Sequence, residues 1–282
     1  MSQAQAHSAS FVPAGRAPVA QQARRTALAG LSVMLALLAP TLLAWMVDER
    51  TLIGVSVWDK PLKFELSFSV HFATLLALLP LLAVPARSGR ALRWSMMAAT
   101  LAVMAEIAWI VAQAGRGRAS HFNNSTQLEA ILYPIMGLGA VTIVIGAFVM
   151  GLLILRRGRD DFGRGLRFGA AAGLIIGSVA TLIVAGLMSS GKVSGPGHWI
   201  GGVRTDATGL PVFGWSTTGG DLRVPHFFAT HSMQALPISG WLADRIAPRR
   251  AVWLVGAAAA GWLALIAATF VEALMGLPLV AV

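Results

Sequence analysis

The sequence has 282 residues and a net charge of +10, and 56% of its residues are hydrophobic whereas only 12% are charged. An ordinary soluble domain carries about 25% charged residues, so this composition excludes a typical water-soluble enzyme. The absence of cysteine also excludes disulfides, thiolate metal sites, iron–sulfur clusters and cysteine nucleophiles. We therefore expect an integral membrane protein.

Seven stretches of the chain are long and apolar enough to cross a bilayer as helices. A hydrocarbon core about 30 Å thick requires about 20 apolar residues per helix. The stretches are 26–46, 61–84, 94–114, 131–154, 168–188, 224–243 and 251–273. They predict an all-α, multi-pass bundle of seven transmembrane helices rather than a β-barrel. The polar segment 1–25 predicts a disordered cytoplasmic tail, which leaves 26–282 as the membrane domain.

Basic residues are biased toward one side of the predicted membrane. With a cytoplasmic N-terminus, the inner segments hold 14 of the 22 Lys and Arg and a net charge of +11, whereas the remainder has a net charge of −1. This bias predicts that the N-terminus is cytoplasmic and that the C-terminus lies on the outer side. Because these residues are short membrane anchors, we expect no nucleic-acid partner.

Glycines recur at every fourth residue of the fifth stretch and its approach, at Gly165, Gly169, Gly173 and Gly177. Small residues at this spacing let membrane helices approach each other closely. We therefore expect this stretch to pack tightly against a neighbouring helix.

The second predicted span carries a polar stripe. At about 100° per residue, Lys60, Lys63, Ser67, His71 and Thr74 fall within an arc of about 80°. Polar groups inside a membrane are costly and usually face the interior of the bundle, so the stripe is a candidate functional surface. The alternative is that the lysines extend to headgroups and that His71 only bonds to another helix.

The third predicted span contains a candidate catalytic carboxylate, Glu106. It lies about two turns inside the outer boundary, where a carboxylate requires a partner or a proton. Candidate partners are Arg116, Arg118 and a histidine. A structural ion pair and a functional carboxylate both remain open.

The sixth predicted span begins with two histidines. Pro225 suits the first turn of a helix, and the helix N-terminus should keep the His226 imidazole neutral. His226 and His231 are five residues apart, so they point about 140° away from each other. We expect them to belong to different parts of one site or to contact different partners, with Gln234 beside them.

Every histidine except His7 lies in the predicted outer half of the protein. His121 is in an outer loop, and His198 is in the loop 189–223, which ends at Arg223. Loops of that length are uncommon unless they are functional or disordered. We interpret 189–223 as a lid over the bundle. The alternative is that Trp199 and Trp215 hold it on the headgroups.

Three strings carry a resemblance: WDKPLKF at 58–64, RASHFN at 118–123 and GWSTTGGDLRVPHF at 214–227. They resemble an uncharacterised group of bacterial seven-span membrane proteins over most of the chain after residue 50. The resemblance implies a bacterial multi-pass membrane protein, and with the charge bias above we expect an inner-membrane location and a periplasmic C-terminus. It implies no activity.

Three hypotheses for function follow. The first is a redox protein that binds haem b or a transition metal, with a quinone as a further candidate partner, because haem b needs only axial imidazoles and a dry pocket. Its candidate cofactor-binding residues are His71, His121, His226, His231 and Gln234, and the metal ligands among them are His71, His226 and His231. The second is a transporter or sensor of a small periplasmic-side ligand. The third is a metal-dependent hydrolase of a lipid-like substrate with Glu106 as its base.

Further polar candidates are Lys60, Lys63, Ser67, His198 and Arg223. The sequence decides neither between these hypotheses nor the oligomeric state.

Overall fold

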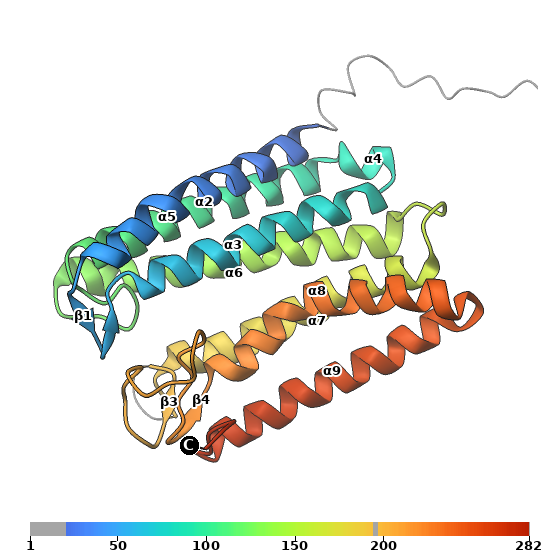
Figure 1. Ribbon diagram of the computed structural model, residues 1–282. Coiled ribbons are helices and arrows are strands. Elements are labelled where there is room, and N and C mark those ends of the chain that lie inside the picture. The colour runs from blue at the N-terminus through green and yellow to red at the C-terminus, as the bar shows by residue number, and fades with distance from the viewer. Residues whose placement is uncertain (1–20, 194–196, 282) are drawn as a thin grey trace, which may run out of the picture.

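The computed structural model describes residues 21–193 and 197–281 of the chain (Figure 1). Seven long helices run alongside one another in this part of the protein. They are α2 (Gln22–Val47), α3 (Asp59–Leu78), α5 (Arg90–Gly115), α6 (Gln127–Arg157), α7 (Arg164–Ser190), α8 (Arg223–Ile246) and α9 (Ala251–Leu274). Each predicted span falls largely within one of these helices, which confirms an all-α bundle.

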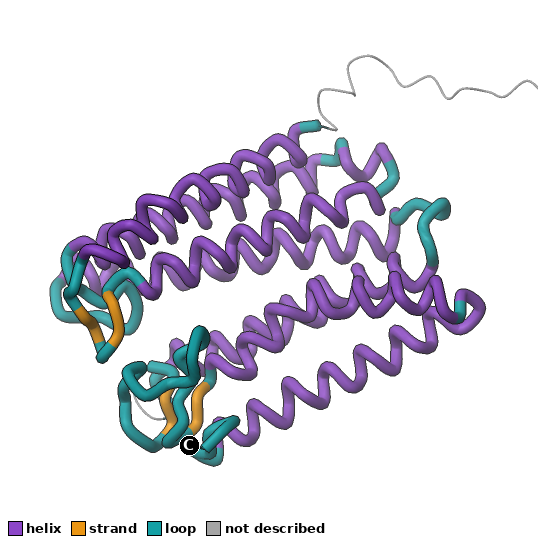
Figure 2. The backbone as a smooth tube through the Cα atoms, in the orientation of Figure 1, coloured by secondary structure: helices purple, strands orange, loops and turns teal. Residues whose placement is uncertain are grey.

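Short elements mark the two ends of the bundle (Figure 2). One end, which we call the hairpin end, carries two small antiparallel ribbons, β1 (Thr51–Leu52) with β2 (Val55–Ser56) and β3 (Trp199–Ile200) with β4 (Gly220–Asp221). The opposite end, which we call the arginine end, carries η1 (Leu79–Leu81), α4 (Val84–Arg87) and η2 (Pro248–Arg250). The described segments that the sequence predicts to be cytoplasmic lie at the arginine end (Figure 1).

Six helices of the described chain are long and apolar enough to cross a membrane. They are α2, α3 with η1, α5, α6, α7, and α9 with η2. The seventh long helix, α8, is 24 residues long but does not reach the same hydropathy, because it includes charged and polar residues such as Arg223, His226 and Asp244. The structure therefore supports a helical membrane protein with six candidate spans.

The helices form two groups, α2, α3, α5 and α6 in one and α7, α8 and α9 in the other (Figure 1). α6 packs against both α5 and α7 and so joins the groups, and α7, α8 and α9 all pack against one another. The hydrophobic core runs from α2 to α7 through fully buried residues such as Phe72, Met96, Met150 and Leu174. α3 and α8 face each other from different groups, and we call the region between them the seam.

The glycine stripe of α7 is the contact with α8, as its spacing predicts. A Cβ atom at Gly165 would lie 2.6 Å from the carbonyl oxygen of Gly240, and one at Gly173 would lie 2.5 Å from that of Ser232. Contacts this short leave no space for a side chain, so the absence of Cβ atoms is what lets the two backbones meet.

Two helix ends differ by a few residues from the predicted boundaries. Helix α2 begins at Gln22, so residues 22–25 are helical rather than part of the predicted tail, whose residues 1–20 lie outside the described chain. The second span does not continue to residue 84. α3 ends at Leu78 and η1 at Leu81, where Pro80 and Pro85 cannot supply the amide hydrogens that a continuous helix needs.

Candidate functional site

Polar residues from separate segments meet at the hairpin end of the seam. We call this set the mouth, and its members are Lys60, Lys63, Glu106, His121 and Arg223. The charge of Lys60 interacts with those of Glu106, Asp206 and Arg223, which come from α5, the long loop and α8. Lys63 lies across the same gap and donates from Nζ to the carbonyl oxygen of Phe213, at 3.4 Å. The mouth therefore brings together candidates from both helix groups.

Glu106 is paired with His121. It is 4% exposed, and its Oε1 lies 3.0 Å from Nε2 of His121. The other imidazole nitrogen, Nδ1, lies 3.0 Å from Oγ of Ser120. Burial lowers the pKa of His121, the nearby Lys60 lowers it further, and Glu106 opposes the shift. His121 is thus held neutral at neutral pH.

The loop that holds His121 is fixed by a polar network. Arg118 does not pair with Glu106 but donates to both oxygens of Glu129, at 2.5 and 2.6 Å. Gln113 Nε2 donates to Oε1 of Glu129 at 2.8 Å and to the Ala119 carbonyl oxygen at 3.0 Å. Our sequence interpretation missed Glu129. The spacing Thr126-x-x-Glu129 is typical of a capping box, and that signal was available.

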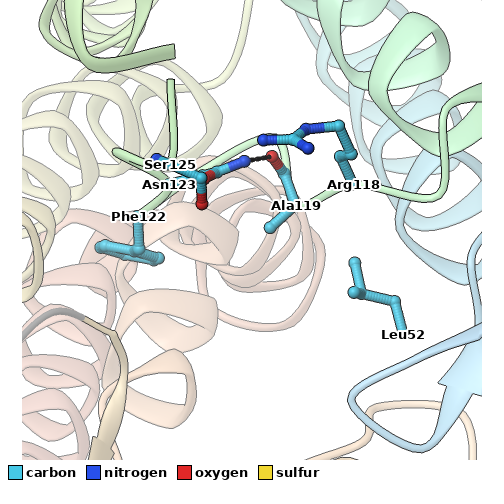
Figure 3. Close-up of a pocket in the computed structure, with 6 residues that line it drawn as sticks. All are labelled: Leu52, Arg118, Ala119, Phe122, Asn123 and Ser125. Carbon is cyan, nitrogen blue, oxygen red and sulfur yellow. Dashed lines mark hydrogen bonds between the residues drawn. The ribbon is translucent and has the colours of Figure 1, made fainter. Parts of the chain in front are cut away.

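A pocket of about 380 Å³ opens beside this loop (Figure 3). The residues that line it include Ala119, Phe122, Asn123 and Leu52. Ala119 and Phe122 are the residues directly before and after the Ser120–His121 pair in the sequence. Asn123 Nδ2 donates to the Ala119 carbonyl oxygen at 2.9 Å, which fixes the turn. The pocket gives this loop an open, partly apolar face.

Arg223 ties the long loop together. Its guanidinium donates to Asp221 at 2.6 Å, to Asp206 at 2.8 Å and to the Gly214 carbonyl oxygen at 2.6 Å. The His198 ring lies against that of Trp199, with centroids 3.7 Å apart and planes tilted by 37°. Burial lowers the pKa of His198, although Asp206 opposes the shift. Arg223 and His198 therefore both contribute to the order of this loop.

The described part of the long loop reaches the first helix group. The backbone amide of Asp206 donates to the carbonyl oxygen of Ile53 in the β1–β2 turn, at 3.0 Å. The Thr205 hydroxyl donates to the same oxygen at 3.2 Å. Together with the contact between Lys63 and Phe213, these hydrogen bonds attach the loop of residues 197–222 to the β1–β2 turn and to α3. The loop therefore crosses the hairpin end of the seam.

A second polar set lies deeper in the seam. Gln234 Nε2 of α8 donates to Oγ1 of Thr74 on α3 at 2.8 Å, and its Oε1 lies 3.1 Å from Nδ1 of His231. α3 and α8 run in the same direction, and His71 precedes Thr74 by three residues just as His231 precedes Gln234. With a rise of about 1.5 Å per residue on both helices, His71 and His231 stand at the same level.

The described residues do not fit a metal site of three or more protein ligands. No three His, Asp or Glu side chains in this part of the chain are grouped so that they could hold one metal ion. Nδ1 of His226 is buried and has no hydrogen-bond partner among the described residues, whereas His231 is bonded to Gln234. The structure thus gives no support to the predicted metal set of His71, His226 and His231.

No protein-family model matches this chain, and no curated protein or solved structure shows significant similarity to it. The fold and the site therefore define the class of the protein on their own. It is a helical membrane protein with a polar mouth at one end of a seam between two helix groups.

Proposed function

We propose that this protein binds a small ligand in the seam between α3 and α8, and that the ligand enters through the mouth. In this proposal α8 is a seventh span, the protein lies in the bacterial inner membrane with its N-terminus in the cytoplasm, and the mouth opens to the periplasm. The protein is then a transporter or a sensor.

The proposal rests on polar residues of α3 and α8 that stand at matching levels on the two helices. Lys63 and Arg223 stand at the same end of the two helices, His71 and His231 stand at one level, and Thr74 is bonded to Gln234. Polar side chains inside a membrane usually face a protein interior or a water-filled cavity. Ser67, which lies in the stripe between Lys63 and His71, is nevertheless exposed. The protein's own side chains thus do not cover Ser67.

The length and the surroundings of α8 support a seventh span. Its 24 residues correspond to about 36 Å at about 1.5 Å per residue, which exceeds a hydrocarbon core of about 30 Å. It packs against α7 and α9, both of which are candidate spans. Arg223 is bonded within the long loop at the hairpin end, Gln234 bonds α3 across the seam, and Asp244 bonds the first turn of α7 at the arginine end, so lipid need not solvate these residues.

Cofactor binding is the second candidate, and one observation favours it. The bond between Nδ1 of His231 and Gln234 leaves Nε2 free, which is the usual arrangement of a ligating histidine. His71 at the same level would supply a second axial imidazole for haem b, and a quinone is the alternative occupant. A Soret band that shifts with dithionite, or stoichiometric metal in the purified protein, would favour this candidate.

The absence of cysteine makes the seam directly testable. We expect Ser67→Cys to react with a charged, membrane-impermeant methanethiosulfonate at least about tenfold faster than Leu66→Cys, because the thiolate forms only where water reaches. Leu66 is the adjacent residue and is 53% exposed, and in this proposal it faces lipid. Equal, slow reaction of both variants would show that lipid or protein fills the seam. Equal, fast reaction would show that α3 does not lie in the membrane.

A further inference from the structure

A hydroxyl, an imidazole and a carboxylate are hydrogen-bonded in series at the hairpin end. Ser120 Oγ lies 3.0 Å from Nδ1 of His121, and Nε2 of His121 lies 3.0 Å from Oε1 of Glu106. Nucleophilic hydrolases use this order of groups, in which the carboxylate orients the imidazole and the imidazole removes the hydroxyl proton. Here the serine contacts Nδ1 rather than Nε2. The chemistry is equivalent, because in a neutral imidazole one nitrogen donates while the other accepts.

The surroundings favour the tautomer that this chemistry needs. The Glu106 carboxylate is buried, and its contact with Nε2 places the imidazole hydrogen on that nitrogen. Nδ1 then has a free lone pair directed at the Ser120 hydroxyl. Lys60 interacts electrostatically with both Glu106 and His121.

The loop is held rigidly around Ser120. Trp109 Nε1 donates to the Ser120 carbonyl oxygen at 3.0 Å, and Gln113 and Asn123 both donate to the carbonyl oxygen of Ala119. Phe122 has a φ of 54°, which is in the left-handed region that non-glycine residues rarely adopt. Strained backbone of this kind persists where surrounding contacts enforce it, and it concentrates at functional sites.

The same loop offers donors for an oxyanion. The backbone amides of Ser120, His121 and Phe122 donate no hydrogen bond within the described part of the chain. These amides belong to Ser120 itself and to the two residues that follow it. Preorganised backbone amides are the groups that stabilise the tetrahedral intermediate of acyl transfer.

We propose that Ser120, His121 and Glu106 hydrolyse a carboxylic ester of an amphiphilic molecule, an activity that goes beyond the ligand binding proposed for the seam. The pocket in Figure 3, of about 380 Å³, is lined by Ala119 and Phe122 on either side of the Ser120–His121 pair, and in this proposal the ester reaches the buried Ser120 hydroxyl from it. The pocket is lined by apolar Leu52, Ala119 and Phe122 together with polar Arg118, Asn123 and Ser125. A lining of both kinds fits an ester that is partly apolar.

The reaction proceeds in two balanced steps. Ser120 Oγ attacks the ester carbonyl carbon while its proton passes to Nδ1 of His121, and the C–O bond to the alcohol breaks as His121 returns that proton to the alcohol. Water then attacks the acyl-serine, gives a proton to His121, and releases the carboxylic acid as Ser120 recovers its proton. One water is consumed, and no other reactant is required.

The test uses the whole 282-residue chain in detergent micelles. We expect a fluorophosphonate probe to label Ser120 and the protein to hydrolyse p-nitrophenyl butyrate. Ser120→Ala should abolish the labelling, and Glu106→Gln should slow hydrolysis by about a hundredfold or more. Ser88→Ala is the control, because Ser88 lies at the arginine end and its hydroxyl bonds only the carbonyl oxygens of Val84 and Pro85. It should retain both activities.

A cysteine variant separates loss of chemistry from loss of fold. Since the chain has no other cysteine, Ser120→Cys should react with iodoacetamide faster than Ser88→Cys, and His121→Ala should remove the difference. The proposal is wrong if the wild-type protein is not labelled, if the label is on another serine, if Ser120→Ala still hydrolyses the ester, or if the two cysteine variants react equally. None of these results bears on Ser67, so the seam proposal is tested separately.

Discussion

Buried carboxylates in this protein differ in how completely they are bound. Glu129 receives hydrogen bonds from Arg118, Gln113 and Thr126. Glu65 on α3 is fully buried, and Thr41 of α2 donates to its Oε1 at 2.7 Å. Its Oε2 is buried without a hydrogen-bond partner in the described chain. Thr41 is therefore the single side chain that binds the Glu65 carboxyl there.

We predict that Thr41→Val lowers the free energy of unfolding by about 1–3 kcal/mol, because it leaves a buried carboxyl group without its hydrogen bond. The control is Thr142→Val on α6, since the Thr142 hydroxyl only bonds the Leu138 carbonyl oxygen of its own helix. That change should have almost no effect. Unfolding in mixed micelles measures both variants, and equal stability of the two would contradict the prediction.

At the scale of elements, α7 and α8 are held together by more than the glycine stripe. Asp244, near the end of α8, accepts hydrogen bonds from the backbone amides of Gly165 and Leu166 in the first turn of α7, at 2.8 and 2.7 Å. Amides of the first helical turn have no partner within their own helix, and a carboxylate there also complements the helix dipole. α8 thus supplies the N-terminal cap of α7.

Asp244→Ala should destabilise the protein by about 1–2 kcal/mol, as the loss of a capping side chain usually does. Asp160→Ala is a matched control near the same helix end. Asp160 is paired with Arg167 but its side chain is 97% exposed, and exposed ion pairs contribute little. Thermal unfolding in detergent compares the two. A similar decrease for both variants would show that the cap from α8 contributes nothing specific.

At the scale of the molecule, two helix groups are connected along α6 and α7 and bridged at the hairpin end by residues 197–222. Arginines gather at the opposite end, in α4, around η2 and between α6 and α7. The positive-inside rule favours the placement of that end in the cytoplasm. The mouth, the pocket in Figure 3 and the described C-terminal residues then share the outer side.

The orientation is measured with single cysteines in intact cells. We expect an impermeant maleimide to label Asn124→Cys in the loop of His121 and Val280→Cys beyond α9. Asp160→Cys at the arginine end should be labelled only after the membrane is opened. The reverse pattern would invert the orientation. If Asn124→Cys were labelled and Val280→Cys were not, the C-terminal residues would lie on the inner side. That result would contradict a seventh span.

The positions of the helices could be read from the sequence, because a bilayer imposes a length and an apolar composition on each span independently of its neighbours. The contact face of α7 was also predictable, since a glycine at every fourth residue leaves one side without Cβ atoms. The boundary near residue 84 was not found, because apolar composition alone does not register the prolines that end η1.

The partners of the polar residues were decided only by the tertiary structure. Periodicity places Lys60, Lys63 and His71 on one side of α3 but does not specify that this side faces α8, which begins 145 residues after α3 ends. By charge alone, Arg118 and His121 were equally suitable partners for Glu106. In the structure Arg118 binds Glu129 instead, and His121 contacts Glu106. A sequence pattern fixes the direction of a side chain on its own helix, whereas the choice of its partner depends on how the helices pack.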